Sequence, residues 1–397
     1  MSTFIQEPAA RLNVVASYDV VVVGGGIAGV SAAVSAAREG ASVCLLEREY
    51  ALGGLATLGL VWCYLPLDDG FGHQIMGSIA EELLKLSVAD GYSRIPPCWA
   101  EKGSPESRRY IRYEVEFNPA SFMILLDKFV QDSGAHIRFG SQFCQVLLEN
   151  GEILAVIVEE KAGRRAILCH AVVDASGDAC VCQRAGEETS VVSNNRLAHW
   201  YACLEGEKYH RYESQVSLSG SLPQGMRLYD GVETLDETDF MLEGRRRIGH
   251  EFIKKARNHA SFLPILLPTL PQIRMSRHLV GKETLHLSDC GRWFDSCVGM
   301  IADWREKGRV YSVPYGTLCA RNITNLWAAG RNISAQSDAG DVIRSIPACA
   351  VTGEAAGAAA ALHTSDHTKF SVSCLQKALL KRGALIDKSL IDQRFFQ

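Results

Sequence analysis

The sequence predicts an α/β protein: a Rossmann-like dinucleotide-binding domain, in which helices cover a parallel sheet that carries a small antiparallel sheet, plus an inserted α+β substrate domain. Three observations predict this fold class. A strand, a glycine-rich turn, a helix and a second strand follow one another near the N-terminus. An amphipathic helix and a β-hairpin lie in the middle, and a helix of small residues lies near residue 350. With 397 residues, 47% of them apolar, the chain can bury a large core.

The first unit spans residues 19–47. The apolar run 19–23 ends in glycines, residues 27–38 are rich in Ala and suit a buried helix, and residues 42–46 form a second buried strand. Gly40 closes the helix, and Glu47 stands at the end of the second strand. We therefore expect a compact βαβ unit with parallel strands.

The second unit begins at Asn118, a good N-cap residue, with Pro119 at the first helical position. Apolar residues recur at helical spacing from 122 to 130, and Gly134 follows, so we expect an amphipathic helix. Strands are expected at 136–139, 143–148 and 153–159, with a hairpin turn at Asn150-Gly151. A further apolar run, 171–174, ends at a Ser-Gly turn.

The third unit is the strand-like run 326–329, which breaks at Gly330, and a helix from about 347 to 362. Gly353, Gly357 and eight alanines in this helix allow another backbone to approach closely. We expect a discontinuous nucleotide-binding domain over 18–62, 116–190 and 310–365, and a substrate domain over 63–115 and 191–309. Residues 1–17 are expected to form a loose tail, and 366–397 a C-terminal extension.

Composition excludes several classes of protein. A net charge of −4 without a block of like charges gives no reason to expect nucleic acid as a partner. Glycines and serines interrupt the apolar stretch 20–37, so we expect no membrane span. Thirteen scattered cysteines without a secretory signal favour the cytoplasm, and the pair Cys180 and Cys182 lacks the partners of a metal site, so no metal is expected.

The glycine-rich turn carries the first chemical prediction. Gly24, Gly26 and Gly29 occupy the three places that let a backbone approach a pyrophosphate at a helix N-terminus. Glu47 follows 23 residues after Gly24, at the position that hydrogen-bonds an adenosine ribose and repels a 2′-phosphate. The residues therefore predict a dinucleotide, FAD or NAD rather than NADP.

Four stretches of the sequence resemble one family. They are "DVVVVGGGIAGVSAAVSAAREGASVCLLERE", "LGGLATLGLV", "AVVDASGD" and "NLWAAGRNISAQSDAGDVIRSIPACAVTGEAAGAAAA", and "QIRMSRHLVGKETLHLSDC" is similar to the family's Arg-rich strand. Together they resemble the FAD-dependent oxidoreductases with the glutathione-reductase-type fold. The resemblance implies FAD as the cofactor. It also assigns the following FAD contacts: Gly24, Gly26, Ala28, Gly29, Glu47, Arg48, Gly53, Gly54, Thr57, Phe143, Ser176, Gly177, Asp178, Gly330, Arg331, Arg344, Ser345 and Ile346.

Arg331 departs from the pattern of the fold. Many relatives place an Asp there, which binds a ribitol hydroxyl, and Asp338 or Asp341 could take over that role. Cys63 and His73 are residue types that can attach a flavin covalently, but non-covalent FAD is the expectation. The helix that opens at Pro347 is similar to the family's helix whose N-terminal dipole stabilises reduced flavin.

The catalytic candidates are Arg277, His278, Arg344 and His199, because hydride transfer at flavin N5 needs a nearby group that handles a proton. If Arg274 and Arg277 converge with Arg344, the substrate carries a carboxylate or an electron-rich oxygen. For the arginines, surface ion pairs are an equally good interpretation. For the two histidines, packing in the core is the better one.

The expected function is hydride transfer between a small hydroxyl- or amine-bearing substrate and FAD. Only one GxGxxG lies between a strand and a helix, and no CxxC accompanies it, so the electrons pass to an external acceptor. One alternative is reduction of an activated C=C bond, as in fumarate-reductase-like proteins. Another is non-catalytic binding, as in GDP-dissociation inhibitors. A tRNA-modifying flavoprotein is disfavoured by the acidic charge, and a homo-oligomer stays open.

Overall fold

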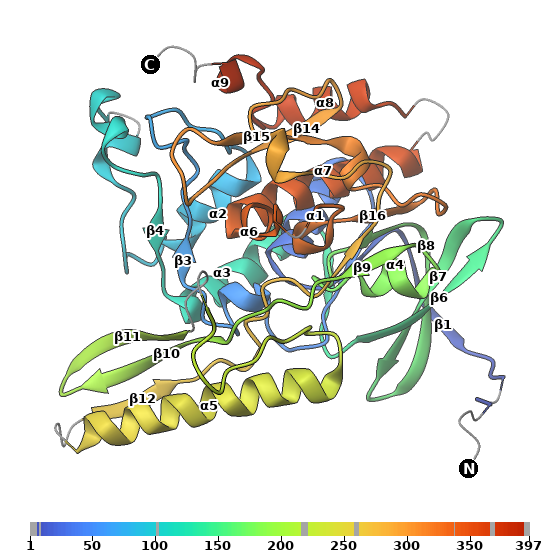
Figure 1. Cartoon of the computed structure of the whole chain (residues 1–397). Helices are drawn as coiled ribbons and strands as arrows, with labels where there is room; N and C mark the ends of the chain where they lie inside the picture. Colours follow the sequence, from blue (N-terminus) through green and yellow to red (C-terminus); the bar gives the residue numbers. More distant parts are fainter. Residues whose placement is uncertain are drawn as a thin grey trace.

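The computed structural model describes residues 6–7, 9–100, 103–215, 221–257, 262–336, 338–365 and 370–392 (Figure 1). Parts of the expected tail, residues 1–5 and 8, lie outside this set. So do residues 366–369 and 393–397 of the expected C-terminal extension.

One sheet organises the nucleotide-binding half. Its strands follow the order β5-β2-β1-β8-β7-β6, and β16 pairs with the far end of β8. The strands β5, β2, β1, β8 and β16 are parallel, whereas β8, β7 and β6 form an antiparallel meander. The bounds are β1 (Asn13–Val23), β2 (Val43–Leu46), β5 (His136–Arg138), β6 (Gln142–Glu149), β7 (Glu152–Glu160), β8 (Gly163–Asp174) and β16 (Leu326–Ala328). This mixed sheet confirms the predicted fold class.

Strand β1 is longer than the apolar run predicts. It begins at Asn13, which pairs with Arg165 of β8, and it continues through a register shift to Val23. The expectation of a loose tail was therefore wrong for residues 13–17. Their side chains are mostly exposed, so the sequence carries no core pattern there, and backbone hydrogen bonds alone extend the strand.

Two helices of small residues pack against each other beside the sheet. They are α1 (Ile27–Arg38) and α7 (Ile346–Ser365). A Cβ on Gly353 would stand 2.2 Å from the carbonyl oxygen of Ala28, and one on Gly357 would stand 2.1 Å from that of Ala32. Only glycine allows this approach. The amphipathic helix α3 (Pro119–Asp132) begins as predicted, because the Asn118 side chain accepts hydrogen bonds from the amides of its first turn.

A second sheet, with the order β11-β10-β12, projects from the main body and is covered by the long helix α5 (Figure 1). Its strands are β10 (Ala198–Glu205), β11 (Lys208–Gln215) and β12 (Phe262–Leu266), and α5 spans Thr234–Ala256. The short strands β9 (Thr189–Val191) and β13 (Arg277–Leu279) pair where the chain leaves and re-enters the nucleotide-binding half. These elements make up most of the expected substrate domain.

Two antiparallel strand pairs cross the expected domain boundaries. Strand β3 (Cys63–Tyr64) pairs with β4 (Val115–Glu116), and β14 (Cys297–Ala302) pairs with β15 (Val310–Pro314). Strand β14 packs on α7 and on α8 (Val372–Lys381), and α2 (Ile79–Ser87) packs on α3 and α7. These parts therefore extend the core of the nucleotide-binding half. The short helices are α4 (Cys180–Arg184), α6 (Gly340–Ile343) and α9 (Ser389–Asp392).

Candidate cofactor and substrate site

A cavity of about 510 Å³ lies where the C-terminal ends of the parallel strands meet α1, α4 and α7. Most of the proposed FAD contacts line it. They are Gly24, Gly26, Ala28, Glu47, Arg48, Gly53, Gly54, Phe143, Ser176, Gly177, Asp178, Gly330, Arg331, Arg344 and Ile346. Gly29, Thr57 and Ser345 do not, and each has a local structural role instead.

The turn from β1 to α1 is built so that backbone faces the cavity. Gly24 has φ +104°, and a Cβ there would stand 2.5 Å from the Ala175 carbonyl oxygen. A Cβ on Gly29 would stand 1.7 Å from the carbonyl oxygen of Gly24, so Gly29 lets the helix fold back on the turn. Gly26, by contrast, has no atom within 4 Å of the place of a Cβ. It caps α1 without a side-chain hydrogen bond, so open space meets the first helical turn at the position expected for a pyrophosphate.

Glu47 closes the adenosine end of the cavity. Its Oε2 accepts a hydrogen bond from the Gly25 amide at 2.6 Å, and its Oε1 accepts one from the Glu49 amide at 2.8 Å. Burial raises the pKa of Glu47, although these two amides favour the charged form. The carboxylate is thus fixed in direction, and each oxygen retains a lone pair that a ribose hydroxyl can use.

The loop after β2 borders the cavity opposite the glycine turn. The amide of Gly53 donates to the carbonyl oxygen of Gly25 at 2.8 Å, which ties the two loops together. Gly53 and Gly54 both have positive φ. The hydroxyl of Thr57 donates to the Leu52 carbonyl oxygen at 2.5 Å, so Thr57 shapes this loop from behind.

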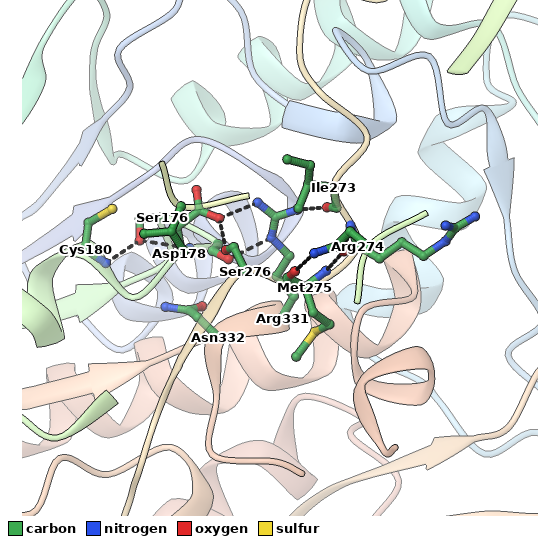
Figure 2. Close-up of polar contacts among 12 residues, drawn as sticks. Ser176, Asp178, Cys180, Ile273, Arg274, Met275, Ser276, Arg331 and Asn332 are labelled. Atoms are coloured by element: carbon green, nitrogen blue, oxygen red, sulfur yellow. Dashed lines mark hydrogen bonds and ion pairs between the residues drawn. The ribbon is translucent and has the colours of Figure 1, made fainter. Parts of the chain in front are cut away.

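Arg331 joins the cofactor turn to the substrate domain (Figure 2). Its guanidinium pairs with Asp178 at 2.7 Å, donates to the Gly177 carbonyl oxygen at 2.7 Å, and donates to the Ile273 carbonyl oxygen. Ser276 also donates to the Asp178 carboxylate. All three nitrogen atoms of the guanidinium therefore donate hydrogen bonds to protein oxygen atoms. Neither Asp338 nor Asp341 lines the cavity, so the structure does not bring a replacement for the ribitol anchor to that place.

The N-terminal end of α7 forms the far wall. Gly330 has φ +80°, and a Cβ there would meet the Cβ of Ala28 at 2.8 Å, so glycine permits β16 to approach α1. Ser345 accepts a hydrogen bond from the Ala348 amide at 3.3 Å and thereby caps α7. Ile346 and Cys349 face the cavity from the first turn of α7, where the helix dipole is positive.

Two arginines lie near this α7 end, Arg344 in the cavity lining and Arg274 outside it. Arg344 lines the cavity and pairs with Asp341 at 2.7 Å. Arg274 is next to the lining residue Ile273. Burial, followed by the charge of Arg344, lowers the pKa of Arg274 to about 10. The NH1 group of Arg274 donates to the carbonyl oxygen of Arg196 at 3.2 Å. Two guanidiniums thus share one nearby carboxylate, and Asp341 also pairs with Arg305.

Arg277 lies at a different part of the cavity. It is a lining residue, and its charge lowers the pKa of Cys180 on α4, although burial dominates and raises that pKa to about 11. Its neighbour His278 points to the other side of β13 and is buried away from the cavity, because alternate residues of a strand face opposite sides. The structure does not bring His278 to the candidate site.

His199 is also remote from the cavity. It lies on the face of β10 that α5 covers, with its ring 4.9 Å from that of Phe240 and against the backbone of Gly244. It is fully buried, and burial lowers its pKa to about 4. The candidate role of His199 in proton transfer therefore gives way to packing beneath α5.

The sequence did not reveal the cavity residues that the substrate domain contributes. Glu237 of α5, Leu270 and Pro271 all line the cavity. Burial raises the pKa of Glu237, and the nearby carboxylate of Asp178 raises it further. No local pattern could have found these residues, because their position depends on how α5 crosses the nucleotide-binding half.

The residues present fit a flavin dinucleotide. Open space at Gly26, an oriented carboxylate at Glu47 and a helix N-terminus at the far wall all border a single cavity. Cys63 and His73 do not line it. Among the residues the structure describes, no three His, Cys, Asp or Glu side chains gather as a metal site. Within the same residues, no helix is long and apolar enough to cross a membrane, and the thirteen cysteines form no disulfide with one another.

Several known proteins are similar to this chain. A stretch of 72 residues is 35% identical to the thioredoxin reductase of Ureaplasma parvum serovar 3 (strain ATCC 700970); it spans 18% of this chain and only 23% of that protein. Among solved structures, a geranylgeranyl bacteriochlorophyll reductase-like protein from Thermoplasma acidophilum is similar at 15% identity and TM-score 0.48, covering 96% of this chain and 86% of its own.

The L-proline dehydrogenase from P. horikoshii is similar at 12% identity and TM-score 0.43, covering 94% and 100% of the two chains. Likeness at this level carries no argument about substrate. The sequence profile of the family described as FAD dependent oxidoreductase, however, matches residues 19–199 and 192–379, which is nearly the whole chain. The protein therefore belongs to the FAD dependent oxidoreductase family.

Proposed function

We propose that the chain transfers hydride between FAD and a small hydroxyl- or amine-bearing substrate that carries a carboxylate, and passes the electrons to an external acceptor. The observation that carries the proposal is Arg344 in the cavity wall at the α7 end, with the buried Arg274 near enough for the two charges to interact. FAD, when bound, supplies the hydride acceptor. The protein's own part is to hold the substrate and its charge beside that acceptor.

The electrostatics of the two arginines favour an anion. Arg274 is largely buried, and the charge of Arg344 disfavours its protonated form. A substrate carboxylate between or beside the guanidiniums would relieve this repulsion and accept charge-assisted hydrogen bonds from both. Asp341 holds Arg344 in place through the 2.7 Å pair, so its direction is set before substrate arrives.

Water exclusion comes from the substrate domain. Leu270, Pro271 and Ile273 place apolar groups on the cavity wall next to Arg274. Such surroundings strengthen an arginine–carboxylate contact, because the effective dielectric constant is lower than in water.

We propose that FAD is held without a covalent bond. Cys63 and His73 lie away from the cavity, and Cys349, which lines it, has its pKa raised to about 11 by burial. A protonated thiol is a poor nucleophile.

Reduction of an activated C=C bond is the second candidate, and one observation favours it. With its pKa lowered to about 10, Arg274 is a better proton donor than an ordinary guanidinium. In that reaction the same two arginines bind the carboxylate of an unsaturated acid, and one of them protonates a carbon.

One experiment tests the proposal and separates the two directions. FAD-loaded protein is mixed anaerobically with hydroxy acids, amino acids and their decarboxylated analogues, and dithionite-reduced protein is mixed with unsaturated acids. Bleaching by a carboxylate-bearing substrate, but not by its analogue, supports oxidation. Reoxidation by unsaturated acids alone favours the second candidate, and bleaching by neutral analogues at equal rates contradicts a carboxylate site.

The substitution Arg344→Gln should weaken the binding of such a substrate by roughly 10- to 100-fold, because one charge-assisted hydrogen bond contributes about 1.5–3 kcal/mol. The measurement is a titration of flavin bleaching. The exposed Arg292, which pairs with Asp289 away from the cavity, gives the matched control Arg292→Gln, which should bind substrate normally.

A further inference from the structure

Helix α5 has apolar side chains on two opposite faces. Its inner face buries Phe240, Gly244 and Ile248 against the second sheet. On the outer side, Leu235, Leu242 and Ile253 are 81%, 57% and 50% exposed. Figure 1 shows α5 along the outer edge of the molecule, with the second sheet on its inner side. The outer face is therefore partly open, although residues 225–229 lie beside Leu242 and Asp239.

The three exposed residues form a single line. Leu242 lies seven residues after Leu235, and Ile253 lies eighteen residues after it. Because a helix turns about 100° per residue, the three side chains point within about 20° of one another. Isolated apolar residues on a surface are ordinary, but an aligned stripe on a helix of about 35 Å is the pattern of a packing face.

The charges of α5 divide at its middle. Residues 233–243 contain five carboxylates and no Lys or Arg, whereas residues 244–257 contain six Lys or Arg and one carboxylate. The helix dipole favours this order only in the first and last turns. Here the division continues to the centre, where the exposed Asp239 precedes the exposed Arg245 and Arg246.

We infer that the outer face of α5 binds a second copy of this chain, with the two α5 helices antiparallel about a two-fold axis near residue 244. Leu235 then packs against Ile253 of the second copy, and the two Leu242 side chains meet near the axis. Glu243 comes level with Arg245 of the second copy, and Asp239 lies within one turn of the residue level with Arg246 of the second copy. The same patch is used twice, as an isologous interface requires.

The charge pattern selects this occupant. An anionic bilayer would attract the basic half of α5 and repel the acidic half, whereas an antiparallel second copy satisfies both. Arg246 pairs with Glu243 at 2.5 Å and Arg227 pairs with Asp239 at 3.0 Å within one chain, so the contacts across the axis would extend these pairs into a network. The exposed Leu263 and Ile265 on β12, which α5 contacts, are available to widen the interface.

A dimer through this face would also affect the cavity, whichever substrate the cavity binds. Glu237 projects from the inner side of α5 and lines the cavity. A dimer across the outer side would hold α5, and with it Glu237, over the cofactor. Dimerisation would thus stabilise the closed wall of the site.

Light scattering coupled to size exclusion tests the inference on full-length, FAD-loaded protein. The wild type should elute at about twice the 43.4 kDa of the chain. Leu242→Arg should raise the dissociation constant by on the order of 100-fold, because the symmetry brings each substitution into the interface twice. The matched control is Ile124→Arg on α3, where the residue is 70% exposed, and it should stay dimeric.

Three results would overturn the inference. They are a wild type that stays monomeric at high concentration, a Leu242→Arg variant that is folded and still dimeric, and a monomer that sediments with phosphatidylglycerol vesicles through α5. Circular dichroism and retained flavin colour establish that each variant is folded. Leu235→Arg, at the end of the stripe, provides a second variant if Leu242→Arg does not fold.

Discussion

At the scale of single residues, two glycines of the same turn have different roles: Gly26 leaves space for a cofactor, and Gly29 is needed for folding. A Cβ on Gly26 meets nothing within 4 Å, whereas one on Gly29 collides with the carbonyl oxygen of Gly24. The backbone of Gly26 is extended, with φ −66° and ψ 179°, which alanine adopts without strain.

Gly26→Ala should therefore fold normally and bind FAD roughly 10- to 100-fold more weakly, since the added methyl group enters the space for the pyrophosphate. Gly29→Ala should fail to fold or lose several kcal/mol of stability through overpacking. Isothermal titration with FAD and thermal unfolding of the apoprotein measure both effects. Equal FAD affinity in Gly26→Ala and wild type would place the pyrophosphate elsewhere.

Arg331 stands where an Asp is expected to bind the ribitol, and here it connects two parts of the chain instead. It links Asp178 and Gly177 of the cofactor turn to Ile273 of the substrate domain. Arg331→Ala should lower the free energy of unfolding by about 2 kcal/mol, because a half-buried carboxylate and two carbonyl groups lose their donor. Arg331→Lys should recover less than half of that loss, since an ammonium cannot reproduce the planar fork.

Urea unfolding of the apoprotein measures the Arg331 effect without any contribution from FAD. Lys128→Gln, at the exposed pair with Asp132, should change stability by less than about 0.5 kcal/mol. If Arg331→Ala proves as stable as that control, the link between the two domains is not held by this guanidinium.

The residues of the glycine turn and Glu47 could be predicted because their signal is local: one turn and the end of the next strand contain it. The location of His199, His278 and Glu237 could not. Which face of a strand points to a cavity depends on its partners, and β10 and α5 are brought together by residues some forty positions apart. The roles of Ser345 and Thr57 were likewise hidden, since a cap and a loop contact do not differ from a ligand contact in sequence.

At the scale of elements, helix α7 contains a buried acid that makes stability depend on pH. Glu354 is 2% exposed, and its carboxylate accepts a hydrogen bond from Ser78 at 2.5 Å. Burial raises its pKa to about 7. The folded state therefore keeps a proton that the unfolded state releases near pH 4.5, so the contribution is fully present below that pH and is lost as the pH rises through 7.

Glu354→Gln should remove this dependence. Between pH 5 and pH 8 the free energy of unfolding of the wild type should fall by on the order of 3 kcal/mol relative to that of the variant. This magnitude follows from the rise in the pKa of Glu354 to about 7. Unfolding curves at several pH values measure the difference. Glu149 is exposed, so the free energy of unfolding of Glu149→Gln should depend on pH as that of the wild type does. If the wild type and Glu354→Gln instead show the same pH dependence, Glu354 is not a buried acid with a raised pKa.

Three helices of the nucleotide-binding half, α1, α3 and α7, were predictable to within a few residues, because glycines flank α1 and because Asn118 and Pro119 begin α3. Strands β1 and β8 are longer than predicted. The outer part of β1 is mostly exposed and rests on backbone pairing, whereas the outer part of β8 mixes buried and exposed residues. The positions of α5 and the second sheet could not be predicted from the sequence. Their pairing is long-range, and an exposed charged helix such as α5 carries a weak core pattern.

At the scale of the whole molecule, the cavity is a joint product of both halves. The nucleotide-binding half supplies the glycine turn, Glu47 and the start of α7, and the substrate domain supplies Ile273, Leu270 and Glu237. Arg331 couples the two through hydrogen bonds to both sides. Filling the cavity should therefore stabilise both halves together, by a free energy that grows with the logarithm of FAD concentration.

The measurement that tests the central claim most directly is the absorption spectrum of the purified protein, loaded with FAD and then precipitated with acid. The proposed site predicts a bound flavin spectrum before precipitation and intact FAD in the supernatant afterwards. A folded protein that takes up no flavin would contradict the cofactor site itself. Flavin that stays with the precipitate would contradict only non-covalent attachment.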